Sequence, residues 1–152
     1  MSTETNKAIV HRYVEEGFNA NNMAVYDELL AANFVYHDPG MPAVRTLQQL
    51  KELHRGEHAA FPDIHVTVED EIADGDKLVQ RWTLRGTHRG DLIEPQGVIP
   101  PTGKQVQVSG IAIYRFAGGK MVEQWLHGDN LGFLQQLGLL PAAEPAGHEA
   151  GA

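Results

Sequence analysis

Two ionisable residues near the C-terminus, His127 and Asp129, are the first candidates for chemistry in this sequence. They follow Trp125 at intervals of two residues, and residues with that spacing share one face of a β-strand. An ionisable pair beside an aromatic ring predicts a pocket floor, where an aspartate can exchange protons with a substrate. A histidine and an aspartate at a strand end are also typical of a helix cap, so spacing alone leaves both interpretations open.

A second pair, His37-Asp38, stands directly before Pro39-Gly40, which predicts that a short strand ends there. Adjacent strand residues point to opposite faces, so we expect at most one of the two to face a pocket. The two His–Asp pairs offer nitrogen and oxygen ligands to a metal ion. His54 and His58, four residues apart, share a helix face, but no zinc-protease motif surrounds them, and a polar helix edge is the preferred interpretation.

Helices followed by strands must position these residues. Apolar residues recur every three or four positions from Ile9 to Phe18, which predicts a first helix with Tyr13 on its apolar stripe. Shorter patterns predict helices over Met23–Ala31 and Thr46–Phe61, with a strand over Phe34–Asp38 between them. After Phe61 the apolar period changes to two, which predicts four strands: 64–72, Lys77–His88, Gln105–Phe116 and Lys120–His127.

This order predicts one α+β domain over residues 1–140, with a curved sheet wrapped around the helices as a cone open at one end. The segment Arg89–Gly103 is rich in glycine and proline and predicts a long loop that borders the mouth of the cone. The tail from Pro141 to Ala152 has low complexity, and we expect it to be disordered.

Composition narrows the classes of function. The chain has 152 residues and no cysteine, which excludes disulfides and thiolate metal sites and suits a cytoplasmic protein. A net charge of −8 argues against a nucleic-acid partner, because phosphate binding uses clustered Lys and Arg. No apolar run reaches membrane-spanning length, so no membrane partner is expected.

Several motifs resemble the SnoaL-like polyketide cyclase (ester cyclase) family of the NTF2-like superfamily. They are Phe61-Pro-Asp-Ile64, Gly86-Thr-His88, Pro101-Thr-Gly-Lys104, Arg115-Phe-x-x-Gly-Lys120, Glu123-x-Trp125-x-x-x-Asp129 and Leu134-Gln-Gln-Leu-Gly138. The resemblance implies an NTF2-like cone, and ring closure by an intramolecular aldol reaction without metal or cofactor. It also implies that Asp129 is the general acid/base, with Trp125 in its apolar wall and His127 as its neighbour.

Two more distant resemblances point to further candidate site residues. Ketosteroid isomerase is similar around Tyr13 and Asp38, which favours Asp38 over His37 as the pocket residue, but Ala112 replaces that enzyme's protonated oxyanion-hole aspartate. The epoxide hydrolases of the superfamily are similar at Asp129 and Arg81 but differ at Thr83. Steroid isomerisation and epoxide hydrolysis are therefore disfavoured, and Arg81 is expected as a pocket cation.

The expected function is that of a cyclase acting on a small apolar carbonyl compound. A related isomerase, lyase or hydrolase on the same cone, and a non-catalytic domain that binds small ligands, are the alternatives. A homodimer or homotetramer that pairs across the convex sheet face is expected from the family. The candidate catalytic residues are Asp129, His127, Asp38 and Arg81, and the candidate pocket residues are Tyr13, His37, Trp125, Ala112 and His54.

Overall fold

The computed structural model describes residues 2–141; the disorder expected beyond Pro141 falls on 142–152, outside the described residues. Helices come first and long strands follow, as the sequence predicts. The elements in order are α1 (Thr3–Arg12), η1 (Tyr13–Asn19), α2 (Ala24–Leu29), β1 (Leu30–His37), α3 (Leu47–Ala60), β2 (His65–Asp74), β3 (Lys77–Thr87), β4 (Leu92–Glu94), β5 (Gly97–Ile99), β6 (Gln105–Ala117), β7 (Lys120–Gly128) and α4 (Asn130–Gln136).

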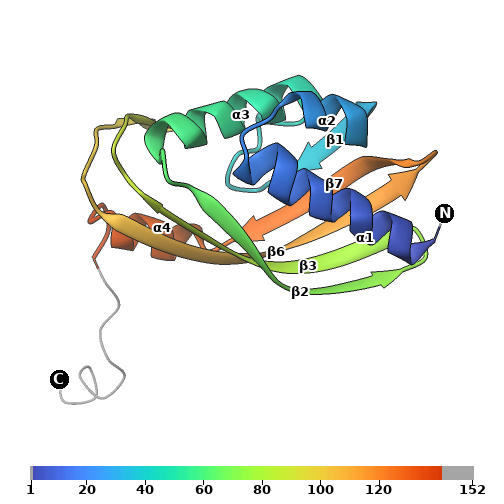
Figure 1. The fold of residues 1–152 in the computed structure, drawn as a ribbon. Coiled ribbons are helices and arrows are strands. Elements are labelled where there is room, and N and C mark those ends of the chain that lie inside the picture. The colour runs from blue at the N-terminus through green and yellow to red at the C-terminus, as the bar shows by residue number, and fades with distance from the viewer. Residues whose placement is uncertain (1, 142–152) are drawn as a thin grey trace, which may run out of the picture.

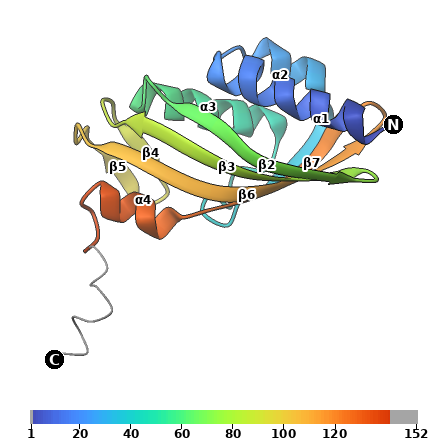
Figure 2. The ribbon, with the colours of Figure 1, turned by 60° about the horizontal axis from the view of Figure 1, so that its bottom comes forward.

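Five strands form one curved sheet in the order β1-β7-β6-β3-β2. β1 runs parallel to β7, and the other neighbours are antiparallel. The helices α1, α2 and α3 lie over the concave face, while α4 sits at the end where β7 finishes (Figure 1). The turned view shows the small β4–β5 hairpin beside α4 at the same end (Figure 2). The α+β class and the curved sheet are confirmed.

The first helix changes its hydrogen-bond pattern halfway along. Over Tyr13–Asn19 it is a π-helix, in which backbone N–H groups donate five residues back, as Ala20 does to Glu15 at 3.0 Å. Such widened turns are frequent at functional sites. Gly17 permits a close approach of the α2 residue Tyr26, because an added Cβ would lie 2.7 Å from the Tyr26 ring. The side chain of Asn19 then bonds both backbone groups of Val66 at 2.8 and 2.9 Å, which fixes the helix end to β2.

A capping box begins α3. Thr46 Oγ1 accepts from the Gln49 backbone N–H, and Gln49 Oε1 accepts from the N–H of Thr46, so two N–H groups at the helix start are satisfied. The inner face of α3 carries Leu50, which is fully buried, and the same face continues through His54. At the other end Asp63 accepts from the Thr87 backbone and hydroxyl, both at 2.7 Å, so the Phe61-Pro-Asp motif joins the end of α3 to β3.

Several predicted boundaries differ from the structure. The second helix ends at Leu29, not Ala31, and the strand predicted over Phe34–Asp38 begins already at Leu30, because Leu30 is extended and pairs with Met121 of β7. Sheet pairing therefore outweighs the helical pattern there. The segment expected as a loop over Arg89–Gly103 contains the β4–β5 hairpin, whose strands of three residues are too short to show alternation. Among the described residues, no helix combines the length and apolar character needed to cross a membrane.

Candidate active site

A cavity of about 310 Å³ lies between the concave sheet face and the helices. Its walls come from η1, α3, the inner faces of β3, β6 and β7, the β4–β5 hairpin and α4. Most of the lining is apolar, including Phe18, Leu53, Phe61, Trp82 and Phe133. The polar lining residues are Tyr13, Tyr36, Asp38, His54, Glu57, Gln80, Glu94, Gln96, Tyr114, Gln124 and Asn130. None of the described residues that line it is lysine or arginine.

Glu57 is the most perturbed carboxyl group of this cavity. Burial raises its pKa to about 8, and the negative charges of Asp38 and Glu94 add to the effect. The side chain keeps 31% of its surface accessible and lines the cavity, so protein atoms shield it while a small molecule can still reach it. A carboxyl group with this pKa is mostly protonated at neutral pH and can act as a general acid.

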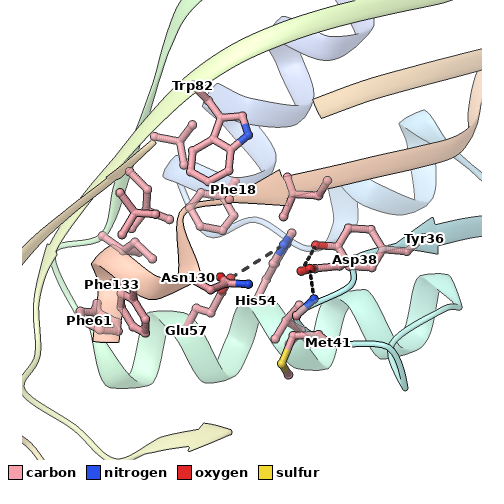
Figure 3. Close-up of a pocket in the computed structure, with 18 of the residues that line it drawn as sticks. Phe18, Tyr36, Asp38, Met41, His54, Glu57, Phe61, Trp82, Asn130 and Phe133 are labelled. Atoms are coloured by element: carbon pink, nitrogen blue, oxygen red, sulfur yellow. Dashed lines mark hydrogen bonds and ion pairs between the residues drawn. The ribbon is translucent and has the colours of Figure 1, made fainter. Parts of the chain in front are cut away.

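His54 lies one helical turn before Glu57 on the same face of α3. Burial lowers the pKa of His54 to about 3, so the imidazole is neutral. The Tyr26 hydroxyl lies 2.6 Å from Nδ1, and a neutral ring that accepts this hydrogen bond carries its proton on Nε2. Nε2 is 3.9 Å from Glu57 Oε1, beyond a direct hydrogen bond (Figure 3).

Asp38 supplies a second carboxylate at the end of β1. Its Oδ2 accepts from the Tyr36 hydroxyl at 3.2 Å and its Oδ1 from the Gly40 backbone N–H at 2.9 Å (Figure 3). Glu94 of the β4–β5 hairpin is the third carboxyl group, and its pKa is raised by burial and by the charge of Asp38. Three carboxyl groups without a lining cation favour a neutral or cationic ligand over an anion.

Three of the nine predicted site residues line this cavity: Tyr13, Asp38 and His54. Tyr13 is 4% exposed, and burial raises its pKa well above 10, so it remains a neutral phenol. Ala112 is buried on the inner sheet face among the core residues but does not line the cavity. The prediction that the segment 89–103 borders the pocket agrees with the structure, because Leu92, Glu94, Pro95 and Gln96 contribute to the wall.

Asp129 was predicted to lie in the pocket, but the structure places it outside. Its backbone leaves the strand after Gly128, the residue is exposed, and its Oδ1 accepts from the Gly132 N–H at 2.9 Å. Asp129 is therefore the N-cap of α4, the second interpretation that its spacing left open, and it does not line the cavity. The helix that it caps places Asn130 and Phe133 in the cavity wall.

The expected pocket cation Arg81 is also placed elsewhere. Arg81 is exposed, whereas its neighbours Gln80 and Trp82 are buried and line the cavity. Because alternate residues of β3 face opposite sides of the sheet, Arg81 belongs to the convex face.

His37, Trp125 and His127 line a second pocket of about 270 Å³, which shares Tyr36 and Asp38 with the cavity. The rings of His37 and Trp125 stack with centroids 5.3 Å apart, and His37 Nε2 lies 2.7 Å from Glu123. On β7 the cavity is lined by Gln124 and Leu126. Trp125 lies between them in sequence, so its side chain is on the opposite face of the sheet, away from the cavity. Within residues 2–141 no group of three or more His, Asp or Glu side chains has an arrangement that could hold a metal ion.

Comparison with known proteins agrees with this architecture. The family model of SnoaL-like polyketide cyclases matches residues 8–137. A protein of Acidithiobacillus ferrooxidans, provisionally described as a polyketide cyclase, has 33% identity and a TM-score of 0.76 over 90% of this chain and 97% of its own. IdmH of Streptomyces antibioticus, with the same provisional description, has 31% identity and a TM-score of 0.74 over 87% and 97%.

AclR of Streptomyces galilaeus, provisionally described as a hydroxylase, has 25% identity and a TM-score of 0.83 over 99% of this chain and 91% of its own. A search of curated proteins returned no significant match. The expected NTF2-like fold is confirmed by these structures. Matched over most of its length, the chain belongs to the SnoaL-like polyketide cyclase family.

Proposed function

We propose that this protein closes a ring in a neutral, polyketide-type carbonyl compound by acid–base chemistry, with Glu57 as general acid and Asp38 as general base. The observation that carries the proposal is the pKa of Glu57, raised to about 8 inside an apolar cavity that also contains Asp38. Glu57 can give up a proton, and Asp38, whose oxygens accept hydrogen bonds from Tyr36 and Gly40, can take one up. The family membership supports the class of substrate.

The proposed step is an intramolecular aldol addition. Asp38 removes a proton from the carbon next to a carbonyl group, and the enolate carbon attacks a second carbonyl carbon of the same molecule. A carbon–carbon bond forms while the attacked C=O π bond becomes a C–O single bond. Glu57 gives its proton to that oxygen, which becomes a hydroxyl group. The proton taken by Asp38 then returns to Glu57 through solvent, so the enzyme is restored without net change.

The absence of lysine and arginine from the described cavity lining supports a neutral substrate. A free carboxylate would meet Asp38 and Glu94 without a compensating cation, which costs binding energy. The apolar walls contributed by Phe18, Trp82 and Phe133 favour a ring system as the bulk of the ligand.

Proton exchange in a simple ketone tests the proposal without knowledge of the natural substrate. 1-Tetralone in D₂O exchanges the protons next to its carbonyl, and NMR measures the rate. We expect this protein to accelerate the exchange and Glu57→Gln to reduce the acceleration about 100-fold. Glu52→Gln, an exposed glutamate of the same helix, is the matched control and is expected to change nothing. Equal rates for Glu57→Gln and the parent would remove Glu57 from the mechanism.

The convex sheet face supports a further part of the proposal, namely a homodimer. A row of directly paired residues crosses it: His37, Trp125, Ile113, Val79 and Ile72 on β1, β7, β6, β3 and β2. Ile72 is 67% exposed, so the row ends in apolar surface open to a partner.

Sedimentation of two variants tests the homodimer. Val79→Glu is expected to yield monomers, whereas Ile93→Glu on the β4–β5 hairpin, 72% exposed, is expected to leave the parent's state unchanged. A dimer that persists in Val79→Glu contradicts pairing across this face.

A further inference from the structure

His54 is a buried polar residue to which the proposed reaction assigns no role. It is 9% exposed and lines the cavity. Its ring is held from two sides, by Phe18 with ring centroids 4.9 Å apart and by Tyr26 with centroids 5.6 Å apart, and both contacts are edge-on. Packing on two sides fixes the directions of the two ring nitrogens before a substrate binds.

The hydrogen bond between Tyr26 and His54 determines which nitrogen carries the proton. Tyr26 is fully buried, and burial raises the pKa of its hydroxyl, so the group keeps its proton. Within residues 2–141 no carbonyl or carboxylate group accepts from that hydroxyl, whereas Nδ1 of His54 lies 2.6 Å away. The Tyr13 hydroxyl partly lowers the Tyr26 pKa, which is the effect of a donor and not of an acceptor. Tyr26 therefore donates to Nδ1, and the proton of the neutral ring is on Nε2.

Nε2 faces the cavity without a partner of its own. It makes no hydrogen bond within the described part of the chain, and it is not among the polar atoms that the protein encloses, so it keeps surface open to the cavity. Glu57 Oε1 is 3.9 Å away, beyond a direct hydrogen bond (Figure 3). The N–H group of His54 and the carboxyl group of Glu57 therefore face the same space.

One oxygen atom fits between these two groups. Hydrogen bonds of about 2.9 Å from the nitrogen and about 2.7 Å from the carboxyl group can meet at a common oxygen, because the two groups are only 3.9 Å apart. A neutral imidazole is a much weaker acid than a carboxyl group, so it donates a hydrogen bond there without giving up its proton. The proton that is transferred is then that of Glu57.

We propose that His54 donates a hydrogen bond from Nε2 to the carbonyl oxygen that Glu57 protonates, and that Tyr26 positions the ring for this. The inference rests on the proposed cyclase function and adds a catalytic residue to it. As the C=O π bond becomes a C–O single bond, negative charge develops on the oxygen, and the Nε2–H group stabilises that charge. Glu57 supplies the proton and His54 keeps its own, so the ring leaves the step unchanged.

Two substitutions of His54 separate this role from a structural one. In His54→Gln the side-chain amide takes the place of Nε2 and keeps a donor there. In His54→Asn the shorter amide takes the place of Nδ1, so it keeps a partner for Tyr26 but lacks the donor.

The exchange of 1-tetralone protons, measured at saturating ketone, is the assay. It passes through the enol, in which the ketone oxygen carries the proton of Glu57. We expect His54→Gln to lose at most about fivefold in rate and His54→Asn to lose about 100-fold. His11→Asn, at an exposed histidine of α1, is the control and should keep the parent rate. The reverse order of the two His54 variants would overturn the inference, because His54 would then act only through its bond to Tyr26. Parent rates in both variants would overturn it as well.

NMR of the histidine rings in the parent protein decides the case in which both variants lose activity. His54 should be the tautomer protonated on Nε2, and its Nε2 proton should move downfield when 1-tetralone is added, while the ring of His11 does not respond. A ring protonated on Nδ1, or an Nε2 proton that does not respond to the ketone, would overturn the inference. Tyr26→Phe should admit the second tautomer, which the same spectrum detects.

Failure of this inference differs from failure of the proposed function. If Glu57→Gln abolishes the exchange and His54→Asn keeps it, the role of His54 is wrong and the proposed function stands. If Glu57→Gln keeps the parent rate while the Nε2 proton still moves downfield with 1-tetralone, the acid–base proposal is wrong and His54 remains a donor to the ketone.

Discussion

The substitution Glu57→Gln is expected to change how the stability of this protein depends on pH. Between pH 4.5 and about 8 the unfolded chain releases the Glu57 proton, while the folded protein retains it. The folded state therefore binds more protons at Glu57 in this window, and the stability that Glu57 contributes falls as the pH rises through it. Glutamine cannot titrate, so the variant lacks this contribution to the pH dependence.

The magnitude follows from the raised pKa. One pKa unit corresponds to about 1.4 kcal/mol, so a rise from 4.5 to about 8 sets an upper limit of about 5 kcal/mol. Because 31% of the Glu57 side chain is accessible, solvent screening reduces this, and we expect about 2–3 kcal/mol.

Urea unfolding at pH 5, 7 and 9 measures the effect. Relative to the parent, Glu57→Gln should gain about 2–3 kcal/mol of stability between pH 5 and pH 9. Glu52→Gln, on the exposed side of α3, should follow the parent at all three pH values. Parallel curves for Glu57→Gln and the parent would refute the argument that burial keeps this carboxyl group protonated.

Three further predictions concern the same elements. His54 should lower the stability below pH 6.5, because the unfolded chain protonates this residue while the buried ring, with its pKa of about 3, stays neutral. Between pH 6.5 and 4, His54→Leu should therefore gain about 2 kcal/mol of stability relative to the parent in urea unfolding. Asp63→Ala removes two hydrogen bonds to Thr87 and should lower the unfolding free energy by about 1–2 kcal/mol, measured at pH 7. If Glu57 is the acid, the rate of 1-tetralone exchange should fall as the pH rises through about 8, and a rate that climbs there would argue for Glu57 as base.

Periodicity alone could have identified Glu57 as an inward-facing residue. Leu50, His54 and Glu57 follow one another at intervals of four and three on α3, so a helix places them on one face. The raised pKa could not be predicted in this way. It depends on burial against other elements and on the charges of Asp38 and Glu94, which are 19 and 37 residues away in sequence.

Strand alternation explains the positions of Arg81 and Trp125. The sequence pattern already separates Arg81 from Leu78 and Trp82 on β3, and the structure places the latter two inside. The similarity to epoxide hydrolases, which implied an inward Arg81, conflicts with this alternation. For β7, the pattern defines two faces but not which one is concave, because that depends on how the strand packs.

The prediction for Asp129 depended on a strand that continued through it. The strand ends at Gly128, and the torsion angles of Asp129, φ −80° and ψ 76°, turn the chain into α4. An aspartate is suited both to cap a helix and to act as an acid or base, so the residue type alone could not distinguish the two roles of Asp129. The acid–base role that the family resemblance implies for Asp129 stays a prediction.

A comparison of two variants decides whether Glu57 or Asp129 is the acid. Asparagine caps helices as well as aspartate does but cannot transfer a proton, so Asp129→Asn separates capping from catalysis. With 1-tetralone exchange as the assay, we expect Asp129→Asn to keep the parent rate within about threefold and Glu57→Gln to lose about 100-fold. The reverse order, with activity lost in Asp129→Asn and kept in Glu57→Gln, would contradict the assignment of Glu57 as the acid.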